Sequence, residues 1–340
     1  MKALVYDGPA TKSCHLADIP EPQVGPGLLK IRLEYAAFCA TDLHVVKHGL
    51  FNRPVGFGLG HEGSGYIVEM GQGTQESGFQ IGDKVAMSGY TPCGVCSECV
   101  SKRDTFCKHP MPMRPMLTEY VCCPVQQVFK LSKDADLRSS CLIEPLACAM
   151  HGMDIAQIQQ GETVCLSGGG GIGMLNLLLI LNKGAAKVTV IEPVATKRSL
   201  ALRLGADYVI DPFNEDVVAK AMEITEGAGY DVVYEASGVP SAAELCMHMI
   251  RGKGRIIYFA CFPMDYELPL NLFDMYAKEV SIFAVNVTND NYLRTINMAE
   301  KLRKELDQII GLEMPLSQAE EAFQAFASSQ YPKVIVKCQP

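Results

Sequence analysis

The chain has 340 residues, of which 48% are hydrophobic and 20% are charged, and its formal net charge at pH 7 is −8. These values are typical of a globular protein with about two domains. The acidic balance argues against a nucleic-acid surface, which needs clustered Lys and Arg side chains. No segment is long and apolar enough to span a membrane, and the start of the chain, MKALVYDGPA, lacks a signal-peptide core. We therefore expect a cytoplasmic protein whose fourteen cysteines are metal ligands or buried thiols rather than disulfides.

The predicted elements fall into two parts. Residues 1 to about 150 are rich in Gly, Pro and Cys and contain short extended runs such as LLKIRLEY (28–35) and GYIVEM (65–70), which predict a β-rich domain with many loops. From about residue 155, strands alternate with helices through ADYVID, YDVVYEASG and GRIIYFA. This alternation predicts an α/β fold with a doubly wound parallel sheet.

The C-terminal part of the chain has a different pattern. It predicts one helical run over 292–310, an amphipathic helix over 316–329 and a strand at KVIVK (333–337). We expect this part to return to the first domain. The predicted division is therefore 1–152 with 290–340, and 153–289.

A glycine-rich turn, SGGGGIG, follows the apolar strand TVCL and opens a helix. Gly168, Gly170 and Gly173 fit G-x-G-x-x-G, and Glu192 ends the next strand. In a strand–turn–helix context this pattern predicts a dinucleotide site, where the backbone approaches the pyrophosphate and a carboxylate takes the ribose hydroxyls. The alternative is a structural turn with a surface glutamate. A carboxylate at the ribose repels a 2′-phosphate, so we expect NAD rather than NADP.

Four cysteines lie within the segment CGVCSECVSKRDTFC, which is otherwise polar. Cys93, Cys96, Cys99 and Cys107 can supply four thiolates to one tetrahedral ion, which suits a structural zinc. An iron–sulfur cluster also accepts four cysteines. A redox C-x-x-C pair would leave two of them unused, and a coincidental group of buried thiols is the remaining alternative.

A second candidate metal site comes from FCATDLH and GHEGSG. Cys39 and His61 are plausible zinc ligands, and Glu62 or another carboxylate would complete an open catalytic site. Considered by spacing alone, a lone buried cysteine or a hydrogen-bonded core histidine is an equally good interpretation.

Several segments together resemble the zinc-dependent medium-chain alcohol dehydrogenase family. GHEGSGYIVEMG fits the family's G-H-E-x2-G-x5-G, FQIGDKV fits the motif that follows it, and CATDLH is similar to C-G-[ST]-D-x-H. IEPLACAMHG resembles the segment that carries a third metal-site carboxylate in the sorbitol, butanediol and threonine dehydrogenase branch. The four-cysteine segment, SGGGGIG, LGAD and KVIV also match, so the resemblance covers essentially the whole chain.

The resemblance implies a Rossmann-type NAD-binding domain beside a GroES-like catalytic domain, with one catalytic and one structural zinc per subunit. It assigns the catalytic zinc to Cys39, His61 and Glu144, with Glu62 as an adjacent, exchanging ligand. Thr41 would hydrogen-bond the substrate oxygen and His44 would pass the proton toward solvent. Further cofactor contacts would come from Ile172 and Lys197. The branch also implies a homo-oligomer, a tetramer rather than a dimer, for which the apolar strand over 280–287 is a candidate contact.

The expected function is oxidation of a secondary alcohol or polyol to a ketone with transfer of a hydride to NAD. A threonine-type amino-alcohol dehydrogenase, a catalytically silent nucleotide-binding relative and a zinc-finger protein are the alternatives. Ala40 replaces the family's usual glycine, which puts the substrate rather than the reaction class in doubt. Four basic residues flank segments that line the expected substrate site and either bind an anionic group or are solvated surface charge: Lys47, His48, Arg53 and Arg114.

Overall fold

The computed structural model describes residues 1–286 and 291–340, which form two compact units. The first unit comprises Met1–Ala147 and the C-terminal segment Thr288–Pro340, and the second comprises Cys148–Val287. The sequence-based division places its boundaries at 152 and 290. In the described part of the chain, no helix has both the length and the hydropathy that a membrane crossing requires.

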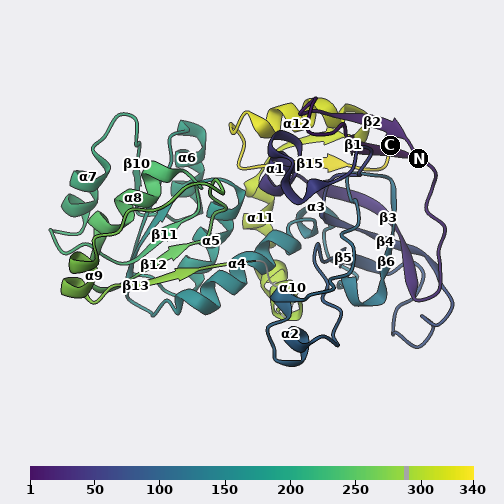
Figure 1. The fold of residues 1–340 in the computed structure, drawn as a ribbon, viewed down its shortest axis with the longest axis horizontal. Helices are drawn as coiled ribbons and strands as arrows, with labels where there is room; N and C mark the ends of the chain where they lie inside the picture. Colours follow the sequence, from purple (N-terminus) through teal and green to yellow (C-terminus); the bar gives the residue numbers. More distant parts are fainter. Residues whose placement is uncertain (287–290) are drawn as a thin grey trace. The chain divides into compact units, whose positions relative to one another are not determined.

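The first unit is built mainly from β-strands (Figure 1). Its strands are β1 (Lys2–Tyr6), β2 (Cys14–Asp18), β3 (Leu28–Ala37), β4 (Glu62–Met70), β5 (Lys84–Met87), β6 (Tyr120–Pro124), β7 (Val128–Lys130), β14 (Ile310–Pro315) and β15 (Lys333–Lys337). Its helices are α1 (Ala40–His48), α2 (Ser97–Val100), α3 (Leu137–Ser140), α10 (Tyr292–Lys301), α11 (Arg303–Ile309) and α12 (Ala319–Ala327). Short 3-10 turns lie at Leu50–Asn52, Asp104–Phe106, Val125–Gln127 and Leu316–Gln318. Helix α4 (Ile143–Ala156) begins in this unit and crosses the boundary between the two.

The sheet of the first unit joins distant parts of the chain. Seven strands have the order β14-β15-β3-β4-β5-β7, with β6 paired to β3, and β1 pairs β2 separately. The C-terminal strand β15 pairs antiparallel with β3, which explains why the C-terminal segment belongs to this unit. The core of the unit is formed by apolar side chains that include Leu29, Ile31, Leu33, Phe38 and Phe323.

The second unit contains the predicted parallel sheet. Its strands are β8 (Thr163–Ser167), β9 (Lys187–Ile191), β10 (Tyr208–Ile210), β11 (Tyr230–Glu235), β12 (Ile250–Tyr258) and β13 (Ser281–Ala284). Its helices are α5 (Gly171–Asn182), α6 (Ala195–Leu204), α7 (Val217–Ile224), α8 (Pro240–Met249) and α9 (Leu272–Lys278). The strands have the order β10-β9-β8-β11-β12-β13, and each neighbouring pair of strands is parallel. This arrangement confirms the doubly wound α/β fold.

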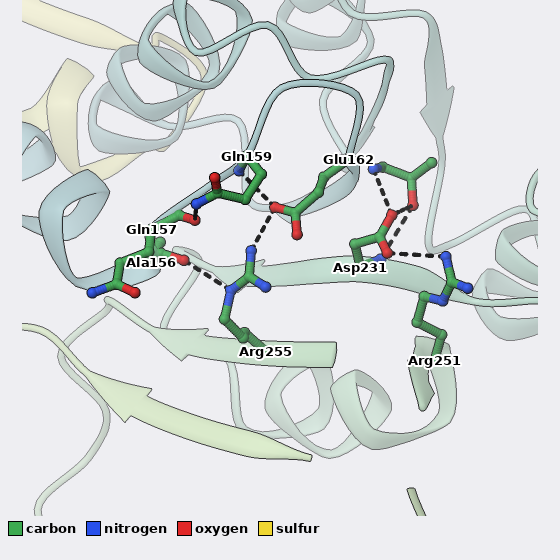
Figure 2. Close-up of polar contacts among 8 residues, drawn as sticks. Ala156, Gln157, Gln159, Glu162, Asp231, Arg251 and Arg255 are labelled. Carbon is green, nitrogen blue, oxygen red and sulfur yellow. Dashed lines mark hydrogen bonds and ion pairs between the residues drawn. The ribbon is translucent and has the colours of Figure 1, made fainter. Parts of the chain in front are cut away.

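Charged side chains fix the amino ends of three of these strands (Figure 2). Asp231 on β11 accepts hydrogen bonds from the Thr163 backbone N–H and hydroxyl at 2.8 and 2.9 Å, and it pairs with Arg251 on β12 at 3.0 Å. Arg255 on β12 donates to the carbonyl oxygen of Ala156 at 2.9 Å and to Glu162 at 2.5 Å. These contacts hold β8, β11 and β12 in register at the end of the sheet opposite to the glycine-rich turn.

The predicted helical run over 292–310 is present as two helices. The run forms α10 and α11 with a break at Leu302, and Ile310 begins β14. Leu302 has φ −97° and ψ 14° and is buried. The break lets α11 turn its own apolar residues, Leu306 and Ile309, into the core, while β14 pairs parallel with β15.

Candidate active site

Sheet register brings the first group of predicted metal ligands together. Cys39 follows β3 and caps α1, whereas His61 directly precedes β4. The two strands pair antiparallel, with Ala37 opposite Glu62, so their neighbours Cys39 and His61 meet at one end of the ladder. The ligand atoms of Cys39, His61 and Glu62 all lie within 4.8 Å of one another. Buried His61 Nδ1 makes no hydrogen bond to a described residue.

Asp42 fixes the two loops that carry these ligands. One of its carboxylate oxygens accepts from the backbone N–H of Cys39 at 3.0 Å, and the other accepts from the backbone N–H of Gly60 at 3.0 Å. The second oxygen also lies 3.8 Å from His61 Nδ1. Burial opposes the ionised form of Asp42, but the His61 ring and these N–H donors hold its pKa below the ordinary value. The sequence analysis missed Asp42, although its place in CATDLH was a usable signal.

Glu62 is held by a lysine from the far end of the chain. Lys333, the first residue of β15, places Nζ 2.7 Å from Oε1 and 2.5 Å from Oε2 of Glu62. Both side chains are buried, with 6% and 0% exposed. Burial raises the pKa of Glu62, and the Lys333 charge opposes this rise. The sequence analysis quoted KVIV as a match but gave Lys333 no role.

Glu144 lies beside the same group. It is the second residue of α4 and is buried. A Cβ added at Gly89 would lie 3.2 Å from Glu144 Oε1 and 3.1 Å from a carbon of the His61 ring, so both groups face this glycine. Within residues 1–286 and 291–340, the closest set of candidate ligand atoms contains Glu62 and not Glu144. Glu144 therefore lies next to the set formed by Cys39, His61 and Glu62 but is not one of its members.

Thr41 and His44 stand on α1 next to this group. Cys39 Sγ and Thr41 Oγ1 are 3.6 Å apart, so the hydroxyl lies beside the candidate ligands. His44 is one turn further along the helix, and its ring centroid is 5.6 Å from that of His48. Burial, together with the charge of His48, lowers the pKa of His44. A neutral imidazole at this position can accept a proton near neutral pH.

The four predicted cysteines of the second metal site also converge. Their sulfur atoms all lie within 4.8 Å of one another, with separations of 3.9 Å between Cys93 and Cys99, 3.5 Å between Cys96 and Cys99, and 3.8 Å between Cys96 and Cys107. A tetrahedral zinc ion with Zn–S bonds of about 2.3 Å places its sulfur ligands about 3.8 Å apart. An iron–sulfur cluster holds its cysteines further apart, because iron and sulfide atoms lie between them. The geometry therefore fits one tetrahedral ion.

The glycine-rich turn of the second unit has the shape that close approach to a phosphate requires. Gly168 has φ +101°, and a Cβ there would lie 2.8 Å from the backbone nitrogen of Ser237. A Cβ at Gly173 would lie 1.9 Å from the carbonyl oxygen of Gly168, so only glycine fits. A Cβ at Gly170, which caps α5, would meet nothing within 4 Å. This open space at a helix N-terminus fits a pyrophosphate group.

Glu192 follows β9 and supports this turn. Its carboxylate accepts hydrogen bonds from the backbone N–H groups of Gly169 at 2.7 Å and Val194 at 2.9 Å. Lys197 Nζ lies 3.6 Å from the same carboxylate, and both side chains are buried. Ile172 stands in the first turn of α5. The structure thus brings Glu192 and Lys197 to the turn, and the sequence alone did not predict the bond to Gly169.

Two family models match the chain. Residues 25–133 match the alcohol dehydrogenase GroES-like domain, and residues 171–302 match the zinc-binding dehydrogenase domain.

Curated relatives match nearly the full length of the chain. An L-threonine 3-dehydrogenase from Pyrococcus furiosus is 30% identical and covers 94% of each chain. A sorbitol dehydrogenase from Halalkalibacterium halodurans is 29% identical and covers 99% of each. A D-arabitol-phosphate dehydrogenase from Enterococcus avium is 27% identical and covers 100% of this chain and 98% of its own.

Solved structures share the whole fold. A candidate zinc-binding dehydrogenase from Clostridium scindens is 30% identical, with a TM-score of 0.92 and 99% coverage of both chains. Another from Sinorhizobium meliloti, solved with bound NADP, is 28% identical, with a TM-score of 0.88 and coverage of 99% and 98%.

Proposed function

Because the chain belongs to the zinc-dependent medium-chain alcohol dehydrogenase family, we propose that it oxidises a secondary alcohol or polyol to a ketone and transfers the hydride to NAD. The observation that carries this proposal is the convergence of Cys39, His61 and Glu62, with ligand atoms within 4.8 Å of one another. Retention of a complete ligand set argues against a catalytically silent relative. The relatives named for threonine, sorbitol and arabitol phosphate support a small hydroxylated substrate.

The proposed catalytic zinc ligands are Cys39, His61 and Glu144. Glu62 lies closer to the other two ligand atoms, but both of its oxygens contact the ammonium group of Lys333. The Glu144 carboxylate is buried beside His61 and can supply the third donor. In this arrangement Glu62 stays next to the site as the exchanging carboxylate.

Bound zinc supplies a Lewis acid that lowers the pKa of an alcohol, and the nicotinamide supplies the hydride acceptor. Thr41 is placed to accept a hydrogen bond from the substrate hydroxyl, because its Oγ1 lies beside Cys39 Sγ. His44 takes the proton onward, since its lowered pKa keeps the ring neutral and able to accept it. Asp42 keeps both ligand loops in place throughout.

The proposed cofactor is NAD, bound by Gly168, Gly170, Ile172, Gly173, Glu192 and Lys197. The buried negative charge of Glu192 at the turn disfavours a 2′-phosphate and offers acceptors to the ribose hydroxyls. The similar structure with bound NADP makes the cofactor the first property to measure.

The four-cysteine group is proposed as a second, structural zinc site, which gives two zinc ions per chain. Four thiolates at tetrahedral spacing leave no open coordination position for a substrate. We also propose a homo-oligomer, a tetramer before a dimer, in the cytoplasm. All fourteen cysteines are free thiols, which fits a reducing compartment.

A threonine-type activity is the second candidate function, because a relative of that name is among the most similar curated proteins. The deciding experiment is NADH formation by zinc-loaded protein with alcohols, polyols, hydroxy acids and amino alcohols. Turnover of a polyol or simple secondary alcohol supports the first proposal. Preference for L-threonine supports the second, and no turnover with any member contradicts both.

A further inference from the structure

Residues 88–91 connect the two candidate metal sites of the first unit. The segment directly follows β5, and Cys93 comes two residues after its end. Its start is fixed, because the Ser88 N–H donates to the carbonyl oxygen of Gln127 at 2.9 Å. Ser88 and Thr91 are both buried. The segment is therefore a short, enclosed path from the sheet into the four-cysteine segment.

Gly89 touches the first candidate site. A Cβ added there would lie 3.2 Å from Glu144 Oε1, 3.1 Å from a carbon of the His61 ring and 3.2 Å from the His61 Cβ. All three distances are shorter than ordinary van der Waals contacts. The backbone at Gly89 is thus part of the surface against which both side chains rest. A shift of this backbone would change the positions that both side chains can take.

Tyr90, the next residue, is bonded to the four-cysteine segment. Its hydroxyl group lies 3.0 Å from the carbonyl oxygen of Asp104 and 3.1 Å from that of Thr105. Both carbonyl groups belong to the 3-10 turn that directly precedes Cys107. The Tyr90 N–H donates to Ser88 Oγ at 3.1 Å, so the backbone is held on both sides of the bend at Gly89. Two adjacent residues of one segment therefore contact both sites.

A separate contact closes the base of the four-cysteine loop. The Met111 N–H donates to the carbonyl oxygen of Thr91 at 2.8 Å, and the two residues form an isolated β-bridge. Met111 lies four residues after Cys107, outside the group of four cysteines. Tyr90 reaches further, because its partners lie inside the loop, next to a metal-ligand cysteine.

Packing does not hold the four-cysteine segment in shape. Its three large apolar side chains, Val95, Val100 and Phe106, are 81%, 70% and 64% exposed. Its helix α2 has four residues, too few to be stable alone. A segment of this kind takes its shape from the ion that its thiolates bind. We therefore expect an ion on the four cysteines to fix the carbonyl groups that Tyr90 contacts.

We propose that Tyr90 is a positioning residue that couples the two metal sites. An ion on the four cysteines fixes the turn over residues 104–106, and the Tyr90 hydroxyl group binds to that turn. Gly89 then holds His61 and Glu144 in place for the second ion. This inference rests on the proposed zinc sites and adds a dependence of one site on the other.

The size of the coupling follows from the way in which outer groups act on metal ligands. Removing a group that orients metal ligands without binding the metal typically lowers metal affinity by about 10- to 100-fold. Coupling between two binding equilibria is reciprocal. Each ion should therefore strengthen the binding of the other by the same factor, and the Tyr90 hydroxyl group should carry this effect.

The test titrates the metal-free protein with Co²⁺ and follows its absorption spectrum, so it does not need turnover. Four thiolates and a single thiolate with nitrogen and oxygen donors give Co²⁺ different spectra, which Cys39→Ala and Cys96→Ala assign to the two sites. Cys96→Ala should raise the Kd for Co²⁺ at the site of Cys39 by about tenfold or more. Tyr90→Phe removes only a hydroxyl group and should raise this Kd by a similar factor, although the four cysteines still bind Co²⁺.

The double variant distinguishes coupling from a general loss of stability. Cys96→Ala combined with Tyr90→Phe should raise the Kd no further than either change alone, because both break the same connection. Tyr66→Phe is the matched control, since Tyr66 lies on β4 of the same unit and contacts Arg32 through its ring. The control should leave the Kd unchanged.

If Cys96→Ala does not fold, the reciprocal measurement takes its place. Cys39→Ala should weaken Co²⁺ binding by the four cysteines, and this difference should vanish when Tyr90→Phe is also present. An unchanged Kd in Tyr90→Phe, or effects of Cys96→Ala and Tyr90→Phe that add, would overturn the coupling and leave the dehydrogenase function intact. A wild type that binds no Co²⁺ through Cys39 would count against both the coupling and the proposed catalytic metal site.

Discussion

Lys333 Nζ lies 2.7 and 2.5 Å from the two carboxylate oxygens of Glu62, and neither side chain has more than 6% of its surface exposed. The pair joins the first residue of β15 to the first residue of β4 across 271 positions of sequence. A charge buried to this degree is tolerated only with a partner. The two residues therefore form one buried ion pair next to the candidate metal ligands.

Lys333→Met should destabilise the metal-free protein by about 3–5 kcal/mol, because it leaves Glu62 buried without its cation. Urea unfolding in the presence of a chelator measures this loss. Lys30→Met is the control, since Lys30 is also buried but pairs with Glu21 and Glu69, which are about half exposed. Its expected loss is about 1 kcal/mol or less, since its partners remain hydrated. Equal losses in the two variants would contradict the importance of this buried pair.

The two proposed zinc ions should have separable roles. Cys39→Ala should abolish turnover and leave NAD binding intact, because the glycine-rich turn belongs to the other unit. Cys96→Ala should lower stability or weaken assembly, since a four-thiolate site organises its own segment through the metal. Metal analysis should find about two zinc ions per wild-type chain and about one in either variant.

The outcome for the wild type decides how the four-cysteine segment is understood. A single zinc per chain, or iron with visible absorbance, would contradict the proposed structural zinc. Loss of NAD binding in Cys39→Ala would contradict the separation of roles.

Cofactor choice should depend on Glu192. Wild-type kcat/KM should be higher for NAD than for NADP, and Glu192→Gln should reduce this ratio by about tenfold or more, because the repelling charge is removed. Asp211→Asn is the control. Asp211 is a carboxylate at the end of the neighbouring strand β10, and it pairs with Arg198 instead of bonding the turn. A wild-type preference for NADP would show that Glu192 does not select the cofactor.

The acid side of the pH profile should respond to His48. His44 accepts a proton only when neutral, so activity falls as pH drops through its pKa. Burial lowers this pKa first and the charge of His48 lowers it further. His48→Gln removes the second cause, which raises the pKa of His44, so the acid limb of kcat/KM should move to higher pH. An unchanged profile would mean that His44 does not limit turnover on the acid side.

Local spacing explains why much of the site could be predicted from the sequence. The cysteines from Cys93 to Cys107 and the turn from Gly168 to Gly173 are each encoded within one short segment, and the structure keeps both together. Lys333 could not be assigned in the same way. Its contact with Glu62 depends on β15 pairing with β3, and no periodicity in KVIVK specifies that partner strand.

Helical periodicity predicts the helical run over 292–310 but not the break within it, because tertiary packing decides where the chain turns. The apolar spacing over 292–310 continues through Leu302 without a proline or glycine, so nothing in the sequence marks the break. The break at Leu302 allows both Leu302 and Leu306 to be buried. Ile310 then joins the sheet as the first residue of β14. The stabilisation from this burial and strand pairing depends on the rest of the fold, so the local sequence carries no signal of it.

Apolar side chains are exposed at one edge of the parallel sheet in the second unit. Among the described strands, β13 pairs with β12 alone. Phe283 on β13 is 36% exposed, and Leu272, Phe273 and Tyr276 on α9 are more than 70% exposed. The predicted contact segment ran over 280–287, of which Val287 lies outside the described residues. An exposed edge with apolar side chains favours pairing with a second copy.

Phe283→Glu should therefore dissociate the proposed oligomer, because it puts a charge on the edge strand where like charges from two copies would meet. Light scattering at micromolar concentration should give a multiple of the 37.0 kDa chain mass for the wild type and a smaller species for the variant. Phe213→Glu is the matched control, since Phe213 is 83% exposed in the same unit but lies away from β13, in the turn after β10. The control should leave the mass unchanged. A monomeric wild type, or an equal change in both variants, would show that copies do not associate through this edge.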